Sequence, residues 1–133
     1  MEKDTRCPCN SGETYEFCCG RYHRGFNDSN APAWPGTALA LMRSRYSAFT
    51  LGLEEFLLAT WHPDTRPEDL VLDEAIVWGA LDIIRTEAGG PFDTRGVVEF
   101  EAHYRLLNQS GSQHEVSDFV REGGRWYYVD AVE

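Results

Sequence analysis

This chain of 133 residues has four cysteines, one lysine and no long hydrophobic run. All four cysteines lie between Cys7 and Cys19, and none occurs later. No apolar run approaches the roughly 18 residues of a membrane-spanning helix, so we expect no membrane association. Residues 1–4 lack the basic start and apolar stretch of a secretory signal. This predicts a cytoplasmic protein, in a compartment where structural disulfides are rare.

Negative charge predominates and is unevenly distributed. The formal net charge is −10, from 12 basic and 22 acidic residues. Residues 1–26 are neutral overall, because the basic side chains of Lys3, Arg6, Arg21 and Arg24 balance those of Glu2, Asp4, Glu13 and Glu16. The whole excess therefore lies on residues 27–133, which would repel phosphate backbones. We expect no nucleic-acid partner.

Helical spacing begins after Thr37, a residue type that caps the amino-termini of helices. Apolar residues then recur at three- and four-residue steps, as Leu41, Met42, Tyr46, Phe49 and Leu53. Gly52 interrupts the pattern, and residues 53–61 predict a second helix or a kinked extension of the first. Pro63 and Pro67 cannot continue a helix and end it. Residues 25–36, rich in Gly, Asn and Pro, predict a linker or a pinned loop.

From residue 70 onward the pattern changes to strands. Residues 70–88 predict one or two strands, and residues 95–107 alternate, with Val98, Phe100, Ala102, Tyr104 and Leu106 on one face. Residues 108–113 predict a turn, and Gly123-Gly124 predicts a tight hairpin. Helices followed by antiparallel strands predict an α+β fold whose helices cover one face of a sheet.

The cysteines form a C-x-C-x8-C-C array at Cys7, Cys9, Cys18 and Cys19. Four thiolates in this spacing suit one tetrahedral, structural Zn²⁺, since no position is left for water. Asn10-Ser11-Gly12 predicts a turn that brings the two pairs together, with backbone N–H groups donating to the sulfurs. Redox-active thiols are the alternative. His23 either replaces one cysteine as a ligand or is an exposed polar residue, and we expect Tyr15 and Phe17 to cover the site.

Residues 7–20, CPCNSGETYEFCCG, resemble the SEC-C motif, C-P-C-x-S-G-x5-C-[CH]-G, a zinc knuckle known from the preprotein translocase motor. The resemblance implies zinc ligands at Cys7, Cys9, Cys18 and Cys19. The translocase knuckle is usually lysine-rich and contacts the chaperone SecB and the ribosome. Glu13 and Glu16 replace that basic character here, so we expect no tight binding to SecB.

The resemblance extends beyond the knuckle. The segments CCGRYHRG, LMRSRYSAF, LLATWHPDTRP and GRWYYVD are similar to the YchJ family of small bacterial proteins. This implies a zinc knuckle at residues 1–26, a linker at 27–36 and an α+β domain at 37–133. The family's body resembles the nuclear transport factor 2 superfamily, a cone of helices packed on a curved antiparallel sheet. The family carries no assigned activity.

Cones of this superfamily often enclose a cavity. The candidates to line one here are Arg43, Arg45, Tyr46, Trp61, His62, Trp78, His103 and Trp126. Arg43 and Arg45 are two residues apart on a helix and point in different directions, so at most one of them easily faces inward. If one is buried, it must be paired, and Asp82 and Asp118 are the candidate partners. Either aspartate is also a candidate proton-transfer base. The alternatives are core packing for the aromatic residues, a helix end for His62 and a solvated strand face for His103.

Two hypotheses about function follow. In the first, the protein is a non-enzymatic adaptor, with the zinc knuckle docking a protein partner and the cone acting as a platform. In the second, the cone binds or transforms a small molecule, as in an isomerase- or hydrolase-like enzyme, and the knuckle stabilises it. The sequence contains no recognisable catalytic constellation, so it favours the adaptor. A polar, enclosed cavity would reverse that preference.

Overall fold

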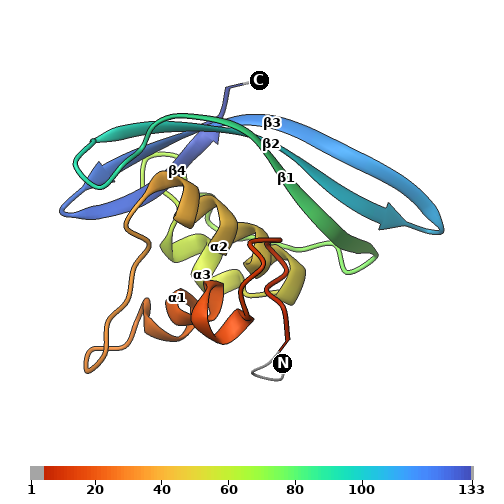
Figure 1. Ribbon diagram of the computed structural model, residues 1–133, viewed down its shortest axis with the longest axis horizontal. Helices are drawn as coiled ribbons and strands as arrows, with labels where there is room; N and C mark the ends of the chain where they lie inside the picture. Colours follow the sequence, from red (N-terminus) through yellow and green to blue (C-terminus); the bar gives the residue numbers. More distant parts are fainter. Residues whose placement is uncertain (1–4, 133) are drawn as a thin grey trace.

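The computed structural model describes residues 5–132 and contains helices packed on one face of a curved four-stranded sheet (Figure 1). The helical elements are a 3-10 turn η1 (Tyr15–Phe17), α1 (Cys19–Gly25), α2 (Ala38–Leu51) and α3 (Glu54–Ala59). The strands are β1 (Ile76–Ala88), β2 (Arg95–Leu106), β3 (Gln109–Glu122) and β4 (Arg125–Ala131). They pair antiparallel in the order β1-β2-β3-β4. The α+β prediction is confirmed.

Helix α2 begins and ends where its sequence predicts. The hydroxyl of Thr37 accepts a hydrogen bond of 3.0 Å from the backbone N–H of Ala40, which satisfies one of the free donors at the helix start. Gly52 ends the helix in the left-handed conformation at φ 72°, which glycine adopts without steric cost. Helix α3 follows directly, as expected for residues 53–61, and Thr60 caps its end.

The alternation in β2 is also confirmed. Val98, Phe100 and Ala102 are buried against the helical layer, while Arg105 is exposed on the opposite face. Residues 70–88 contain a single strand, β1, with register shifts between Trp78 and Ala80 and between Ile83 and Arg85.

One hairpin turn is confirmed and the other is corrected. Gly123 and Gly124 both have positive φ and join β3 to β4. The turn expected at residues 108–113 is wrong, because β3 already begins at Gln109 and the turn consists of Leu107 and Asn108, at φ 50° and 68°. Gly111 is a packing residue instead. A Cβ there would lie 2.8 Å from the ring of Tyr104 on the adjacent strand.

The segment 27–36 is a pinned loop. The indole N–H of Trp34 donates a hydrogen bond of 2.9 Å to the carbonyl oxygen of Trp126 in β4. The guanidinium of Arg125 lies 4.5 Å from the centre of the Trp34 ring, and Pro35 is fully buried. These contacts hold the loop against the sheet.

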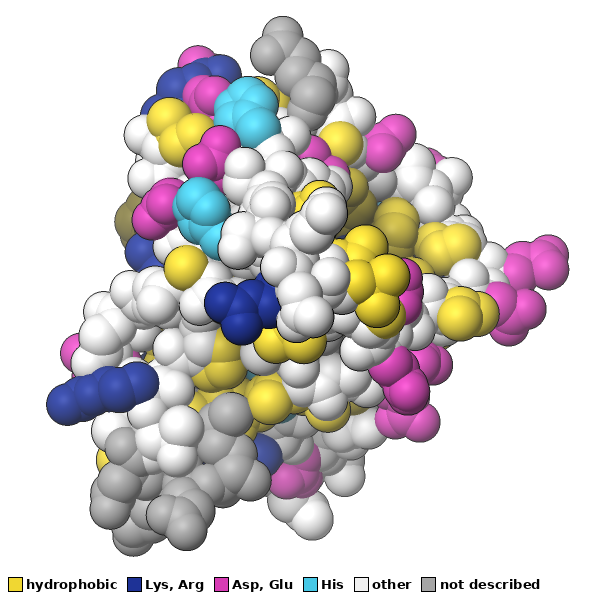
Figure 2. Space-filling view, turned by 90° about the vertical axis from the view of Figure 1, so that its right-hand side faces the viewer, with side chains coloured by type: hydrophobic (Ala, Val, Ile, Leu, Met, Phe, Trp, Pro, Cys, Tyr) yellow, Lys and Arg dark blue, Asp and Glu magenta, His cyan; other side chains and the backbone are white. Residues whose placement is uncertain are grey.

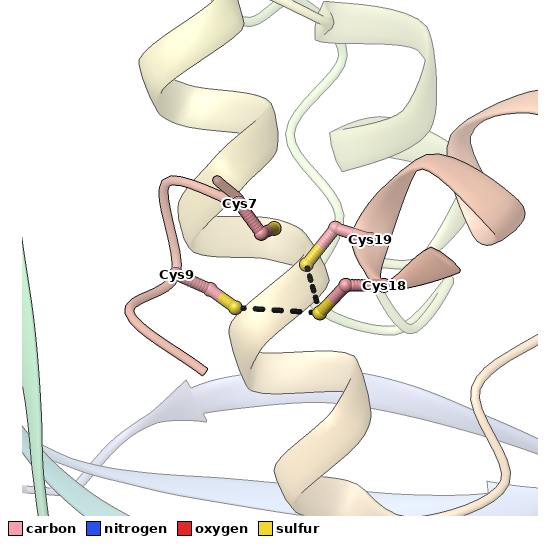
Figure 3. Close-up of side chains that lie close together, drawn as sticks. All are labelled: Cys7, Cys9, Cys18 and Cys19. Carbon is pink, nitrogen blue, oxygen red and sulfur yellow. Dashed lines mark hydrogen bonds between the residues drawn. The ribbon is translucent and has the colours of Figure 1, made fainter. Parts of the chain in front are cut away.

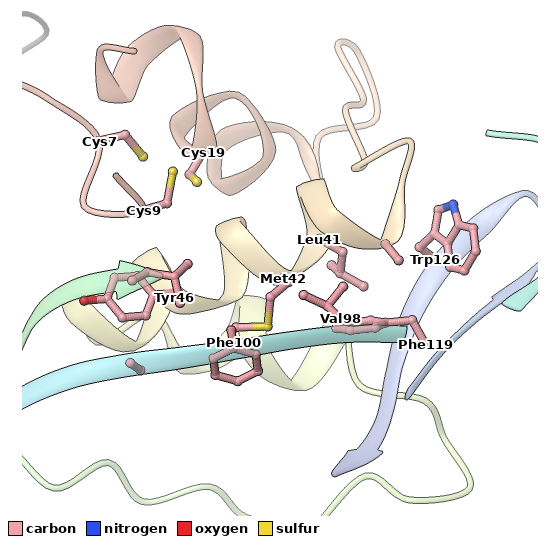
Figure 4. Packing of buried hydrophobic residues seen from close by; sticks show 13 residues of the cluster. Cys7, Cys9, Cys19, Leu41, Met42, Tyr46, Val98, Phe100, Phe119 and Trp126 are labelled. Carbon is pink, nitrogen blue, oxygen red and sulfur yellow. The ribbon is translucent and has the colours of Figure 1, made fainter. Parts of the chain in front are cut away.

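The main hydrophobic core lies between α2 and the sheet and continues to the far side of α2 (Figure 4). On the sheet side, Leu41 and Met42 pack with Val98 and Phe100. On the other side, the core includes three of the cysteines, Cys7, Cys9 and Cys19. Helix α2 is therefore buried from both sides. Each large apolar side chain removed from water stabilises the fold by roughly 1.5–3 kcal/mol.

Within the part of the chain that the structure describes, no helix has the length and hydrophobicity needed to cross a membrane.

Candidate functional site

The four cysteines converge from two short segments (Figure 3). Cys7 and Cys9 lie on the loop before η1, Cys18 precedes α1, and Cys19 is its first residue. All four sulfur atoms lie within 4.8 Å of one another. The Cys9–Cys18 and Cys18–Cys19 sulfur pairs are 3.6 and 3.9 Å apart. A tetrahedron with metal–sulfur bonds of about 2.3 Å has edges of about 3.8 Å. The cluster therefore has the donor atoms and the size to bind one metal ion.

A tight turn at residues 10–12 produces this convergence, as the sequence predicts. Asn10 and Gly12 have positive φ, at 64° and 90°, and the backbone N–H of Cys7 donates to the carbonyl oxygen of Glu13 at 2.9 Å. Gly20 supports the second segment. A Cβ on Gly20 would lie 2.6 Å from the carbonyl oxygen of Tyr15. The segments η1 and α1 can therefore approach this closely only because residue 20 is a glycine.

Serine hydroxyls contact the sulfurs, and the backbone of Ser11 also hydrogen-bonds the Cys9 thiol, as the sequence predicts for this turn. The hydroxyl of Ser11 lies 3.1 Å from the Cys18 sulfur, and that of Ser47 in α2 lies 3.5 Å from the Cys7 sulfur. A hydroxyl that donates to a thiolate stabilises its negative charge and orients it toward a metal.

The thiols also influence one another. Hydrogen bonds from Cys19 and Cys7 lower the pKa of Cys9, so this thiol ionises readily. Burial raises the pKa of Cys18 to about 11, while hydrogen bonding to Cys7 and Cys9 raises that of Cys19. Without a cation, close packing therefore favours one thiolate over several. A divalent metal would displace the remaining protons.

The expectation of an exposed His23 is wrong, and within residues 5–132 His23 does not join the group of close cysteines. It is half-buried, and both ring nitrogens are hydrogen-bonded. The Nδ1 atom accepts from the hydroxyl of Tyr15 at 2.6 Å, and Nε2 donates to the carbonyl oxygen of Ser44 at 2.8 Å. Tyr15 covers the cluster as predicted, whereas Phe17 is 68% exposed and does not.

A second candidate site is a pocket of about 260 Å³ between α2 and the concave face of the sheet. It is lined by Met42, Arg45, Tyr46, Phe49, Trp61, Trp78, Phe100, Ala102, Gln113, Glu115 and Tyr128. The sequence predicts four of these residues, Arg45, Tyr46, Trp61 and Trp78. It contains no signal for the contribution of β3 and β4, because that depends on how the sheet curls over the helices.

The other predicted lining residues lie elsewhere. Arg43 points to the knuckle, and its Nη1 donates a hydrogen bond of 2.7 Å to the carbonyl oxygen of Cys9. Trp126 is core. His62 binds Glu122 through Nε2 at 2.9 Å and accepts from the backbone of Asp64, which is the helix-end role considered above. Asp82 and Asp118 do not line the pocket either.

His103 lies on the solvated strand face, where its Nε2 contacts Asp82 at 2.7 Å and Glu101 at 3.6 Å. These three side chains are close enough to hold a cation, but all are at least partly exposed. On the face shown in Figure 2, histidines lie beside acidic side chains, and acidic side chains are spread across the surface. This agrees with the net charge of the body.

Arg45 is the unusual group in the pocket wall, since it is only 3% exposed. Its expected pairing with Asp82 or Asp118 is wrong. Instead, Nη1 donates to the carbonyl oxygen of Leu57 at 2.8 Å and to the hydroxyl of Thr60 at 2.7 Å. The guanidinium carbon lies 5.0 Å from the centre of the Trp61 ring and 4.5 Å from that of Tyr128. Burial lowers the pKa of Arg45 to about 9, which leaves the side chain charged at neutral pH.

Polar groups near Arg45 complete the wall. Glu115 accepts hydrogen bonds of 3.0 Å from Gln113 and from the hydroxyl of Ser117. The indole N–H of Trp61 is the one buried side-chain nitrogen or oxygen without a hydrogen-bond partner in the chain from residue 5 to 132. Burial raises the pKa of Tyr128 to about 12, so its phenol stays neutral.

A cysteine knuckle packed on a cone of helices and curved sheet defines the class of protein. The family described as the YchJ middle NTF2-like domain matches residues 37–131. A UPF0225 protein from Chromobacterium violaceum is 54% identical over 129 residues, covering 95% of this chain and 91% of the relative. One from Corynebacterium efficiens is 50% identical over 125 residues, covering 94% and 91%. The chain belongs to the YchJ (UPF0225) family.

Solved structures agree. A SEC-C motif containing protein from Rhodopseudomonas palustris, determined in solution, has a TM-score of 0.78 and 30% identity, over 96% of this chain and 97% of that one. A crystal structure of a SEC-C motif containing protein from Psychrobacter arcticus has a TM-score of 0.79 and 26% identity, over 98% and 84%. The proposed resemblance to SEC-C proteins and the cone fold are thus confirmed.

Proposed function

We propose that this protein binds a small molecule in the pocket of its cone, and that its four cysteines hold one structural Zn²⁺. The observation that carries the proposal is the buried charge of Arg45 in an aromatic-lined pocket. A buried guanidinium is costly, and although Arg45 has two hydrogen bonds and two ring contacts, it forms no salt bridge within residues 5–132, so a purely structural core would not favour it here. The pocket is mainly apolar and partly open, so it is not the polar, enclosed cavity expected of a ligand site above, but apolar walls around a few polar groups are the usual composition of ligand sites.

The knuckle acts in this proposal as a brace for the pocket. Three contacts tie it to one side of α2: Cys7 to Ser47, Cys9 to Arg43 and His23 to Ser44. A fourth contact reaches the sheet, where the side chain of Asn10 accepts from the backbone N–H of Leu81 at 2.6 Å. The other side of α2 supplies Met42, Arg45 and Tyr46 to the pocket wall. A zinc ion that fixes the knuckle would therefore also fix these side chains.

The adaptor remains a second candidate because the knuckle has an exposed surface. Phe17 and Arg21 are exposed there, and the guanidinium of Arg21 lies 4.9 Å from the centre of the Tyr22 ring. A protein partner with an apolar or basic patch would fit this surface, because the protein as a whole carries −10. A docked partner would protect the knuckle without occupying the pocket, so the two functions are separable by experiment.

A fragment screen by thermal shift on the zinc-loaded protein tests the pocket. We expect some compounds to raise the melting temperature of the wild-type protein but not that of Ala102→Val, which narrows the pocket. Ala31→Val is the matched control, since Ala31 is exposed on the pinned loop. If no compound acts, or if Ala102→Val responds as the control does, small-molecule binding in the pocket is contradicted.

A further inference from the structure

We propose that the ligand of this pocket is a small organic monocarboxylate, anchored by the free edge of the Arg45 guanidinium. This inference rests on the proposed function, because it requires that the pocket binds a ligand at all.

The hydrogen bonds of Arg45 leave one edge of the guanidinium available. Nη1 is held by Leu57 and Thr60, whereas Nε and Nη2 make no hydrogen bond within residues 5–132 and, unlike the indole nitrogen of Trp61, are not fully buried. The N–H groups of Nε and Nη2 are parallel, and their spacing matches the two oxygens of a carboxylate. The rings of Trp61 and Tyr128 lie against the same guanidinium and hold it in place. A carboxylate would complete this group with two charge-assisted hydrogen bonds.

Charge balance selects a monoanion. Arg45 is the only basic residue among those that line the pocket, in the described part of the chain, and Glu115 opposes a second negative charge. A phosphate dianion would meet one cation and one fixed carboxylate, and so would gain little. A monocarboxylate could bind Arg45 and remain on the side of the pocket away from Glu115.

Size and lining define the rest of the ligand. A volume of about 260 Å³ lies just below the roughly 300–1,000 Å³ typical of drug-sized ligands, so a ligand of fragment size fits. Tyr46, Phe49, Trp78 and Phe100 supply apolar and aromatic surface away from the charged groups. The body of the carboxylate should therefore be aromatic or branched aliphatic.

The test is a nuclear magnetic resonance titration of the full, zinc-loaded chain with benzoate, phenylacetate and isovalerate. The corresponding neutral amides and inorganic phosphate are the comparison ligands. We expect the carboxylates to shift the Arg45 Nε–H and Trp61 Nε1–H signals and to bind at least about tenfold more tightly than their amides, the equivalent of about 1.4 kcal/mol. Phosphate should not compete.

Two variants locate the anchor. Arg45→Lys keeps the charge but loses the paired donors and should abolish the preference for carboxylates, whereas Arg105→Lys, exposed on the opposite face of the sheet, should keep it. Glu115→Gln preserves shape and removes the opposing charge, so it should strengthen carboxylate binding about threefold or more. This second variant keeps the proposal testable if Arg45→Lys fails to fold.

Each contrary result has a distinct meaning. Equal binding of carboxylates and amides overturns the monocarboxylate class but leaves the pocket as a binding site. Competition by phosphate, or weaker carboxylate binding in Glu115→Gln, overturns the anchor as described. No shift at the pocket with any of these compounds overturns the inference, while the wider fragment screen decides separately whether the pocket binds other ligands.

Discussion

Arg43 and Arg45 lie two residues apart on α2 and serve opposite sides of that helix. Arg43 donates a hydrogen bond of 2.7 Å to the carbonyl oxygen of Cys9 in the knuckle, while Arg45 is buried in the wall of the pocket. Opposite sides of a single turn of one helix thus connect the candidate metal site to the candidate ligand site. If the knuckle loosens, the side chains that α2 contributes to the pocket wall should therefore become less ordered as well.

The cysteine geometry predicts one zinc ion per chain. Elemental analysis of protein purified without added metal should give about one equivalent, and Cys9→Ser should give much less because it removes a buried ligand. Less than about half an equivalent of zinc in the wild-type protein, with all thiols open to titration, would contradict the site.

The serine hydroxyls next to the sulfurs should tune metal affinity. Ser47→Ala and Ser11→Ala each remove a hydroxyl within 3.5 Å of a sulfur atom, and each should lower zinc affinity about tenfold. Competition with a chromophoric chelator measures the change. Ser112→Ala, at an exposed position on β3, is the matched control. Affinities equal to that of the control would show that the hydroxyls do not act on the thiolates.

His23 should titrate below its ordinary pKa of 6.5, mainly because burial disfavours the charged ring. The neutral ring also accepts a hydrogen bond from Tyr15, which protonation would break. Since the unfolded chain takes up this proton first, the contribution of His23 to stability is present above pH 6.5 and is lost as the pH falls through the folded pKa.

A ring-proton titration of the zinc-loaded protein measures the pKa of His23 directly. Tyr15→Phe removes the hydroxyl that donates to Nδ1 and should shift the midpoint upward, toward 6.5. A wild-type midpoint at or above 6.5 would show that His23 is more solvated than its contacts indicate.

Net charge should prevent tight binding to SecB and to nucleic acid. The protein carries −10, and both partners present negative surfaces that repel it over a Debye length of about 8 Å at physiological salt. Titrations of SecB and a generic RNA at low salt are the strictest test, because attraction from local basic residues is least screened there. A dissociation constant below about 1 μM for either one would show that local contacts on the knuckle override net charge.

Local patterns in the sequence were sufficient for much of the fold. The cap at Thr37, the stop at Gly52 and the alternation in β2 depend on neighbouring residues, so each could be predicted directly. The turn at 108–113 was misplaced because Gly111 looks like a turn residue, although it serves the packing of Tyr104.

The pocket was harder to predict because it is a property of the whole sheet. Opposite directions for Arg43 and Arg45 follow from helical geometry and were predicted. The partners of Arg45 were not, since Leu57 and Thr60 approach it only after α3 folds back along α2. Glu115 and Gln113 face the pocket because of the register and curl of β3, for which the sequence contains no local signal.

The central claim is that the zinc knuckle braces the helix that lines the ligand pocket. Amide and indole N–H spectra recorded before and after zinc is chelated, with and without a pocket ligand, test it most directly. We predict that chelation disorders residues 5–26, that the strand signals of β1–β4 persist, and that the ligand no longer shifts the Trp61 indole signal. An unchanged response of Trp61 after complete zinc removal would contradict the account.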